Sequence, residues 1–115
     1  MDIVFSILSI VLAMVCVLVA AAEFTGQPAI VDTMDRLGAT RIIPVLVAAK
    51  MIAAVALLVG LALAQVGVAA AGGLVAYFVL AIGAHLRVRD SLTDTAGAIV
   101  LASLSAVTLA AGLAG

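Results

Sequence analysis

The sequence has little charge and no tryptophan. Charged residues make up 10% of its 115 positions, whereas hydrophobic residues make up 68%. A water-soluble domain carries roughly a quarter of charged residues to cover its surface, so this chain is not expected to fold as a water-soluble globule. Its formal net charge of -1 provides no basic surface for nucleic acid. We therefore expect lipid to surround most of the chain.

Cysteine and tyrosine each occur once, as Cys16 and Tyr77. A single thiol excludes an internal disulfide, a Cys-x-x-Cys redox pair and a zinc site made by this chain alone. Cys16 lies within an apolar run, and we expect it to be a small buried hydrophobic residue. Because aromatic residues are so few, the belts that usually mark the two membrane interfaces are almost missing.

Apolar segments of membrane-spanning length occupy most of the chain. A spanning helix needs about 20 mostly apolar residues, and such segments lie at about residues 3–24, 42–64, 67–86 and 94–113. We expect a tight turn at residues 65–67 between the second and third segments. The connections after the first are short, which favours antiparallel neighbours. Residues 1–115 therefore predict a single transmembrane domain: an all-α, antiparallel up-down-up-down bundle of four helices.

The first connection contains a weakly apolar segment at about residues 29–37. Its hydrophobic side chains recur at helical spacing on one face, and its charged side chains occupy the other face. Gly38 is well suited to end a helix. These features predict a short helix that lies on the membrane interface.

Only the first and third connections contain basic residues, which are Arg36, Arg41, Arg87 and Arg89. The second connection and both ends of the chain have none. By the positive-inside rule, we expect the first and third loops in the cytoplasm and both termini outside. The excess of alanine and valine is typical of a GC-rich bacterium, so we expect a bacterial cytoplasmic membrane.

Polar residues near one membrane face form the candidate site, and they are Glu23, Lys50, His85, Arg87, Arg89 and Asp90. Glu23 ends the first span, His85 ends the third, and Lys50 lies roughly 12 Å into the second. An unpaired charge at that depth costs a few kcal/mol. Lys50 can pair with Glu23, extend to the nearby surface, or take part in ligand or proton chemistry.

His85 is the only histidine, which is too few for a bis-histidine haem or a zinc site from this chain alone. It can bond a quinone carbonyl, move a proton, or bond a backbone carbonyl or Glu23. Arg87 and Arg89 can anchor the helix end at lipid phosphates, pair with Asp90, or bind an anionic group. We predict no metal site and no catalytic residue.

Residues 81–90, AIGAHLRVRD, resemble the end of the third helix in the DoxX-like family, where small residues lead into His-Leu-Arg and an acidic residue. Residues 47–61 are similar to the second helix of that family, and Leu37-Gly38 matches its loop. The family typically has a basic residue late in the first helix and a glutamate in the second. Here Glu23 and Lys50 stand at those places with exchanged charges, which suits an ion pair better than a fixed catalytic role.

The resemblance, over roughly residues 3–109, implies a four-helix membrane protein with relatives linked to thiosulfate–quinone oxidoreduction or to oxidative-stress complexes. We expect a non-catalytic subunit or accessory of such a complex, with membrane lipids, other membrane subunits or a second copy as partners. A quinone or lipid between the helices would be its ligand. The alternatives are a small multidrug-resistance-like transporter or channel and a membrane-protein assembly factor. Fold alone does not decide among these functions.

Overall fold

The computed structural model describes residues 3–114, and these residues form only helices and turns. The elements are α1 (Ile3–Phe24), α2 (Pro28–Leu37), the 3-10 helix η1 (Thr40–Ile42), α3 (Ile43–Val59), α4 (Ala64–Arg87) and α5 (Leu92–Ala114). Within the described part of the chain, four helical segments are long and apolar enough to cross a membrane. They lie in α1, η1 with α3, α4 and α5. The predicted all-α membrane fold is confirmed.

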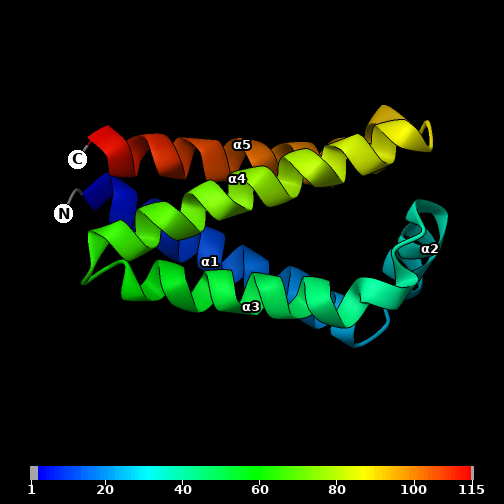
Figure 1. The fold of residues 1–115 in the computed structure, drawn as a ribbon, viewed down its shortest axis with the longest axis horizontal. Helices are drawn as coiled ribbons and strands as arrows, with labels where there is room; N and C mark the ends of the chain where they lie inside the picture. The colour runs from blue at the N-terminus through cyan, green and yellow to red at the C-terminus, as the bar shows by residue number, and fades with distance from the viewer. Residues whose placement is uncertain (1–2, 115) are drawn as a thin grey trace.

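The four long helices lie side by side along the 40 Å axis of the molecule (Figure 1). α1 packs mainly on α3, and α4 packs mainly on α5; contacts between α3 and α4 and between α1 and α5 join the two pairs. Each long helix runs opposite to the one before it, so both ends of the described chain lie at the same end of the bundle. This is the up-down-up-down order that the short connections predict.

Hydrophobic side chains cover the outside of the bundle as well as its core. Leu18, Ile52, Leu80 and Val100 are more than half exposed in the isolated chain. Such a surface suits hydrocarbon rather than water. Cys16 is 1% exposed and belongs to the buried hydrophobic core, as expected from its position in an apolar run.

The turn between α3 and α4 lies earlier than predicted. α3 ends at Val59 and α4 begins at Ala64, so the turn consists of residues 60–63 and not 65–67. Backbone N–H groups of residues 62 and 63 donate to the carbonyl of Val59 and close the turn. Gly67 lies inside α4, where it packs closely against Gly60. A Cβ added to Gly60 would lie 2.4 Å from the Cα of Gly67.

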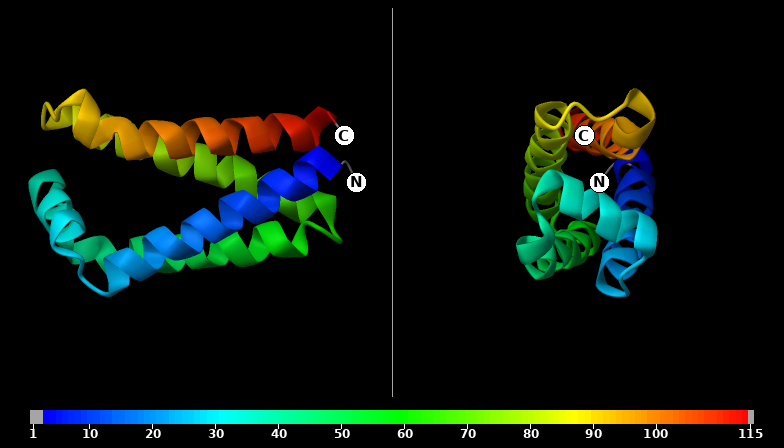
Figure 2. Two further views of the ribbon diagram at one scale, coloured as in Figure 1. Left: turned by 180° about the vertical axis from the view of Figure 1, so that it is seen from behind. Right: turned by 90° about the vertical axis from the view of Figure 1, so that its right-hand side faces the viewer.

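The short helix predicted at about residues 29–37 is α2. It lies across the end of the bundle opposite to the described chain ends (Figures 1 and 2). Gly26 and Gly38, which flank it, both have a φ of 72°, a left-handed conformation that glycine adopts without steric cost. Gly38 is also its C-terminal cap and donates its N–H to the last turn. These two bends direct α2 across the spans.

Candidate functional site

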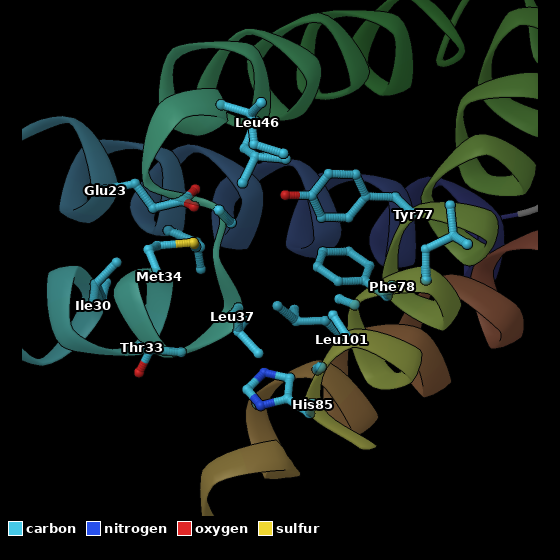
Figure 3. Close-up of a pocket in the computed structure, with 18 of the residues that line it drawn as sticks. Glu23, Ile30, Thr33, Met34, Leu37, Leu46, Tyr77, Phe78, His85 and Leu101 are labelled. Atoms are coloured by element: carbon cyan, nitrogen blue, oxygen red, sulfur yellow. The ribbon is translucent and has the colours of Figure 1, made fainter. Parts of the chain in front are cut away.

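A cavity of about 600 Å³ lies between α2 and the adjoining ends of the long helices. Its volume is within the range of roughly 300–1,000 Å³ that small-molecule sites occupy. Its walls are mostly apolar and include Ile30, Met34, Leu46, Phe78 and Leu101 (Figure 3), together with Ala81. The polar residues in the lining include Glu23, Lys50, Tyr77, His85 and Arg87.

Lys50 and Glu23 form a buried ion pair in the wall of this cavity. Lys50 Nζ lies 2.6 Å from Glu23 Oε1, and the two side chains are 3% and 1% exposed. Among the alternatives that the sequence leaves open for Lys50, the structure has the pair with Glu23 rather than an extended side chain at the surface. The pair joins α3 to α1, because each helix contributes one partner.

Tyr77 is a third member of this group, and the sequence analysis did not include it in the site. Lys50 Nζ donates a hydrogen bond to Tyr77 Oη at 2.5 Å and lies 4.6 Å from the centroid of the ring. Tyr77 and His85 are about two helical turns apart on α4, a spacing that places both on one face. That spacing was the signal in the sequence that could have identified Tyr77.

His85 belongs to a separate polar group at the end of α4. Its Nδ1 lies 2.6 Å from Asp90 Oδ2, and the other carboxylate oxygen of Asp90 pairs with Arg36 of α2. His85 is therefore bonded to Asp90 and not to Glu23. The sequence predicts a single polar cluster, but the structure has two polar groups, one around Lys50 and one around Asp90.

Arg87 adds a second link between α4 and α2. Its Nη2 donates to the backbone carbonyl of Leu37 at 2.8 Å. Together with the pair between Arg36 and Asp90, this bond holds the C-terminal end of α2 against the end of α4. Arg89 is exposed, has a φ of 57° and is not part of the cavity lining. Binding of lipid phosphates by these arginines stays a prediction.

The site combines apolar walls with a compact set of hydrogen-bonding groups. Glu23 Oε2 is buried and has no hydrogen-bond partner among the described residues. Over residues 3–114, no group of three or more His, Cys, Asp or Glu side chains is arranged to hold a metal ion. The geometry therefore suits the binding of a largely apolar molecule that has a polar end.

Comparison with known proteins places the chain in a family. The model of the DoxX-like family matches residues 7–108, which is most of the chain. No curated protein and no solved structure matches the chain. The matched region runs from α1 into α5 and so contains the whole cavity. With its four apolar helices, the chain is a multi-pass membrane protein that belongs to the DoxX-like family.

Proposed function

We propose that this protein is a non-catalytic subunit or accessory of a redox or oxidative-stress complex in a bacterial cytoplasmic membrane, and that it holds a quinone or lipid. The observation that carries the proposal is the cavity of about 600 Å³ between the helices, with apolar walls and a few buried polar groups. Membership of the DoxX-like family supports the redox association.

The chemistry of the cavity favours an amphipathic ligand without a net charge. Glu23 and Lys50 pair with each other, so their charges offset and the wall beside them attracts neither anions nor cations strongly. The apolar walls accommodate a ring or an alkyl chain, and the polar groups orient its polar end. Lys50 is held by Glu23 Oε1 and by Tyr77, so its ammonium is not available as a nucleophile, which supports a binding role.

Purification in a mild detergent, followed by mass spectrometry of proteins and small molecules, tests the proposal. We expect a quinone or a lipid in a stoichiometric amount, together with one or more other membrane proteins. A homo-oligomer that contains neither a partner protein nor a quinone or lipid would contradict it.

A small transporter is the second candidate, and the unpartnered Oε2 of Glu23 favours it. A buried carboxylate beside a cavity is a group that proton-coupled transport uses. Proteoliposomes loaded with a pH-sensitive dye measure proton flux driven by a gradient of cationic substrate. Transport predicts a flux that Glu23→Gln abolishes, and the absence of any flux removes this candidate.

A further inference from the structure

Tyr77 has a hydrogen-bond donor that its described contacts do not use. A phenol has one O–H donor and also accepts through its oxygen. Lys50 is an ammonium and can only donate, so Tyr77 is the acceptor in the 2.5 Å contact between them. The O–H of Tyr77 is therefore available to another acceptor, and the side chain lines the cavity.

The surroundings of Tyr77 hold this donor in one orientation. Its ring packs edge-to-face on Phe78, with the centroids 5.0 Å apart and the planes at 80°. Figure 3 shows the hydroxyl directed away from α4 toward the side of the cavity where Leu46 and Glu23 lie. A donor with a fixed orientation binds a ligand at a lower entropic cost than a mobile one.

The ion pair strengthens Tyr77 as a donor. Glu23 holds the ammonium of Lys50, and Lys50 in turn bonds the oxygen of Tyr77. A hydroxyl oxygen that accepts a bond from a cation draws electron density from its own O–H, so the chain of bonds makes that O–H a better donor. Glu23 and Lys50 thus position the hydroxyl of Tyr77.

We propose that Tyr77 donates a hydrogen bond to a carbonyl oxygen of an uncharged ring compound in the cavity, and that a quinone is the class of ligand. This inference deepens the proposed function and rests on it. A carbonyl oxygen is an acceptor without a proton of its own, which matches a site that offers a donor. A carboxylate or phosphate bonded to Tyr77 would bring a negative charge toward the buried, unpartnered Oε2 of Glu23, so an anionic group is disfavoured beside Tyr77, although Arg87 also lines the cavity.

The test compares two probes of similar shape, of which only the first carries hydrogen-bond acceptors. The first is 2-decyl-1,4-benzoquinone, and the second is 2-decyl-1,4-dimethylbenzene, in which methyl groups replace the two carbonyl oxygens. Binding is measured for the wild-type protein, for Tyr77→Phe and for the control Met34→Leu, all in nanodiscs. Met34 lines the same cavity, and leucine keeps its apolar character and approximate volume.

We expect Tyr77→Phe to bind the quinone about tenfold more weakly than the wild type, which corresponds to one hydrogen bond. Binding of the hydrocarbon probe should be the same in both proteins. Met34→Leu should bind the quinone as the wild type does. In infrared difference spectra, the carbonyl stretch of the bound quinone should lie at lower frequency in the wild type than in Tyr77→Phe.

A measurement on the wild type alone removes dependence on the folding of the variant. Tyr77 is the only tyrosine and the chain has no tryptophan, so in detergent solution, without a scaffold protein, tyrosine emission reports on this side chain alone. Saturable quenching by the quinone supports the inference. The infrared band of the quinone bound to wild type supports it as well if it is shifted below the frequency of free quinone in hydrocarbon.

The outcomes separate the inference from the proposed function. Equal quinone affinity and equal carbonyl frequency in wild type and Tyr77→Phe would overturn the role of Tyr77 but leave a quinone-holding protein. A wild type that retains lipid and does not bind the quinone would overturn the inference and leave the lipid form of the proposal. A wild type that binds neither quinone nor lipid would overturn both.

Discussion

Lys50 of α3 and Glu23 of α1 are joined by a 2.6 Å ion pair in which both side chains are almost completely buried. A buried pair of this kind is strongly destabilised when one partner is removed or reversed, because the remaining charge is left without compensation. We therefore expect the attraction between the two side chains, rather than either charge alone, to hold α1 against α3.

A charge-reversal cycle tests this relationship. Glu23→Lys and Lys50→Glu each place two like charges in the buried site, and each should lower the free energy of unfolding by about 3–5 kcal/mol. The combined exchange restores opposite charges and should recover most of that loss. Unfolding in mild detergent provides the measurement. If the combined variant is no more stable than either single variant, the pair does not hold α1 to α3.

The contact between Gly60 and Gly67 predicts a second effect on stability. A Cβ at Gly60 would lie 2.4 Å from the Cα of Gly67 and 2.7 Å from its backbone nitrogen, so the backbone of the α3–α4 hairpin must move. We expect Gly60→Ala to cost about 1–3 kcal/mol in the same unfolding assay. The matched control is Gly73→Ala, since a Cβ there meets nothing within 4 Å.

Gly73→Ala should be neutral or should stabilise the protein by up to about 1 kcal/mol, because alanine favours helix more than glycine does. Equal effects of the two substitutions would show that close backbone approach does not set the α3–α4 turn.

Asp90 should control how firmly α2 stays against the bundle. Asp90 bonds His85 of α4 and Arg36 of α2, so Asp90→Asn loses the charge that links them. The reporter is Met34→Cys, a cavity-facing position on α2, in a Cys16→Ala background that removes the native thiol. We expect the rate of thiol labelling to rise about tenfold, because α2 separates from the end of α4 more often.

Asp32→Asn is the control for this experiment. Asp32 also pairs with Arg36, at 3.5 Å, but it is largely exposed. Exposed ion pairs contribute little to stability. Its labelling rate should match that of the unchanged background. A rise of the same size in both variants would mean that loss of charge near α2, rather than the bond to Asp90, controls the exposure of the cavity.

The distribution of arginine predicts the orientation in the membrane. Arg36, Arg41, Arg87 and Arg89 all belong to the connections at the α2 end of the bundle, and the positive-inside rule places that end in the cytoplasm. In the Cys16→Ala background, Leu113→Cys should react with an impermeant maleimide in intact cells. Thr93→Cys should react only after the cells are opened. The reverse pattern would contradict this orientation.

The sequence was sufficient to predict the four spans and the short helix, and it indicated the pair of Glu23 with Lys50 as one of three alternatives for Lys50. Span length follows from bilayer thickness, and a lysine that deep requires a partner. The rotation of each helix about its axis was not predictable, because lipid-facing and core-facing residues are equally apolar and leave no amphipathic pattern. For that reason the contact of Tyr77 with Lys50 was missed, and the spacing of Tyr77 from His85 along α4 was the one signal that pointed to this residue.

Two other features depend on geometry that local sequence does not contain. The turn at residues 60–63 is apolar except for Gly60. Residues 65–67 contain a polar Gln65 and a second glycine, Gly67, so the turn was predicted there instead. The pair between Arg36 and Asp90 depends on how α2 crosses the bundle, which Gly26 and Gly38 set through left-handed bends. Arg36 was therefore used to predict the orientation in the membrane and was not predicted to be part of the site.

Filling the cavity tests the central claim most directly. Ala81 lines the cavity about one helical turn from Tyr77, whereas Ala76 of the same helix is exposed on the outside of the bundle. Ala81→Trp and Ala76→Trp therefore add the same side chain inside and outside. Quinone and lipid that remain with each protein after mild-detergent purification are measured by mass spectrometry. We predict that Ala81→Trp loses the bound molecule while Ala76→Trp and the wild type keep it; retention of an undiminished amount by a folded Ala81→Trp would contradict binding in this cavity.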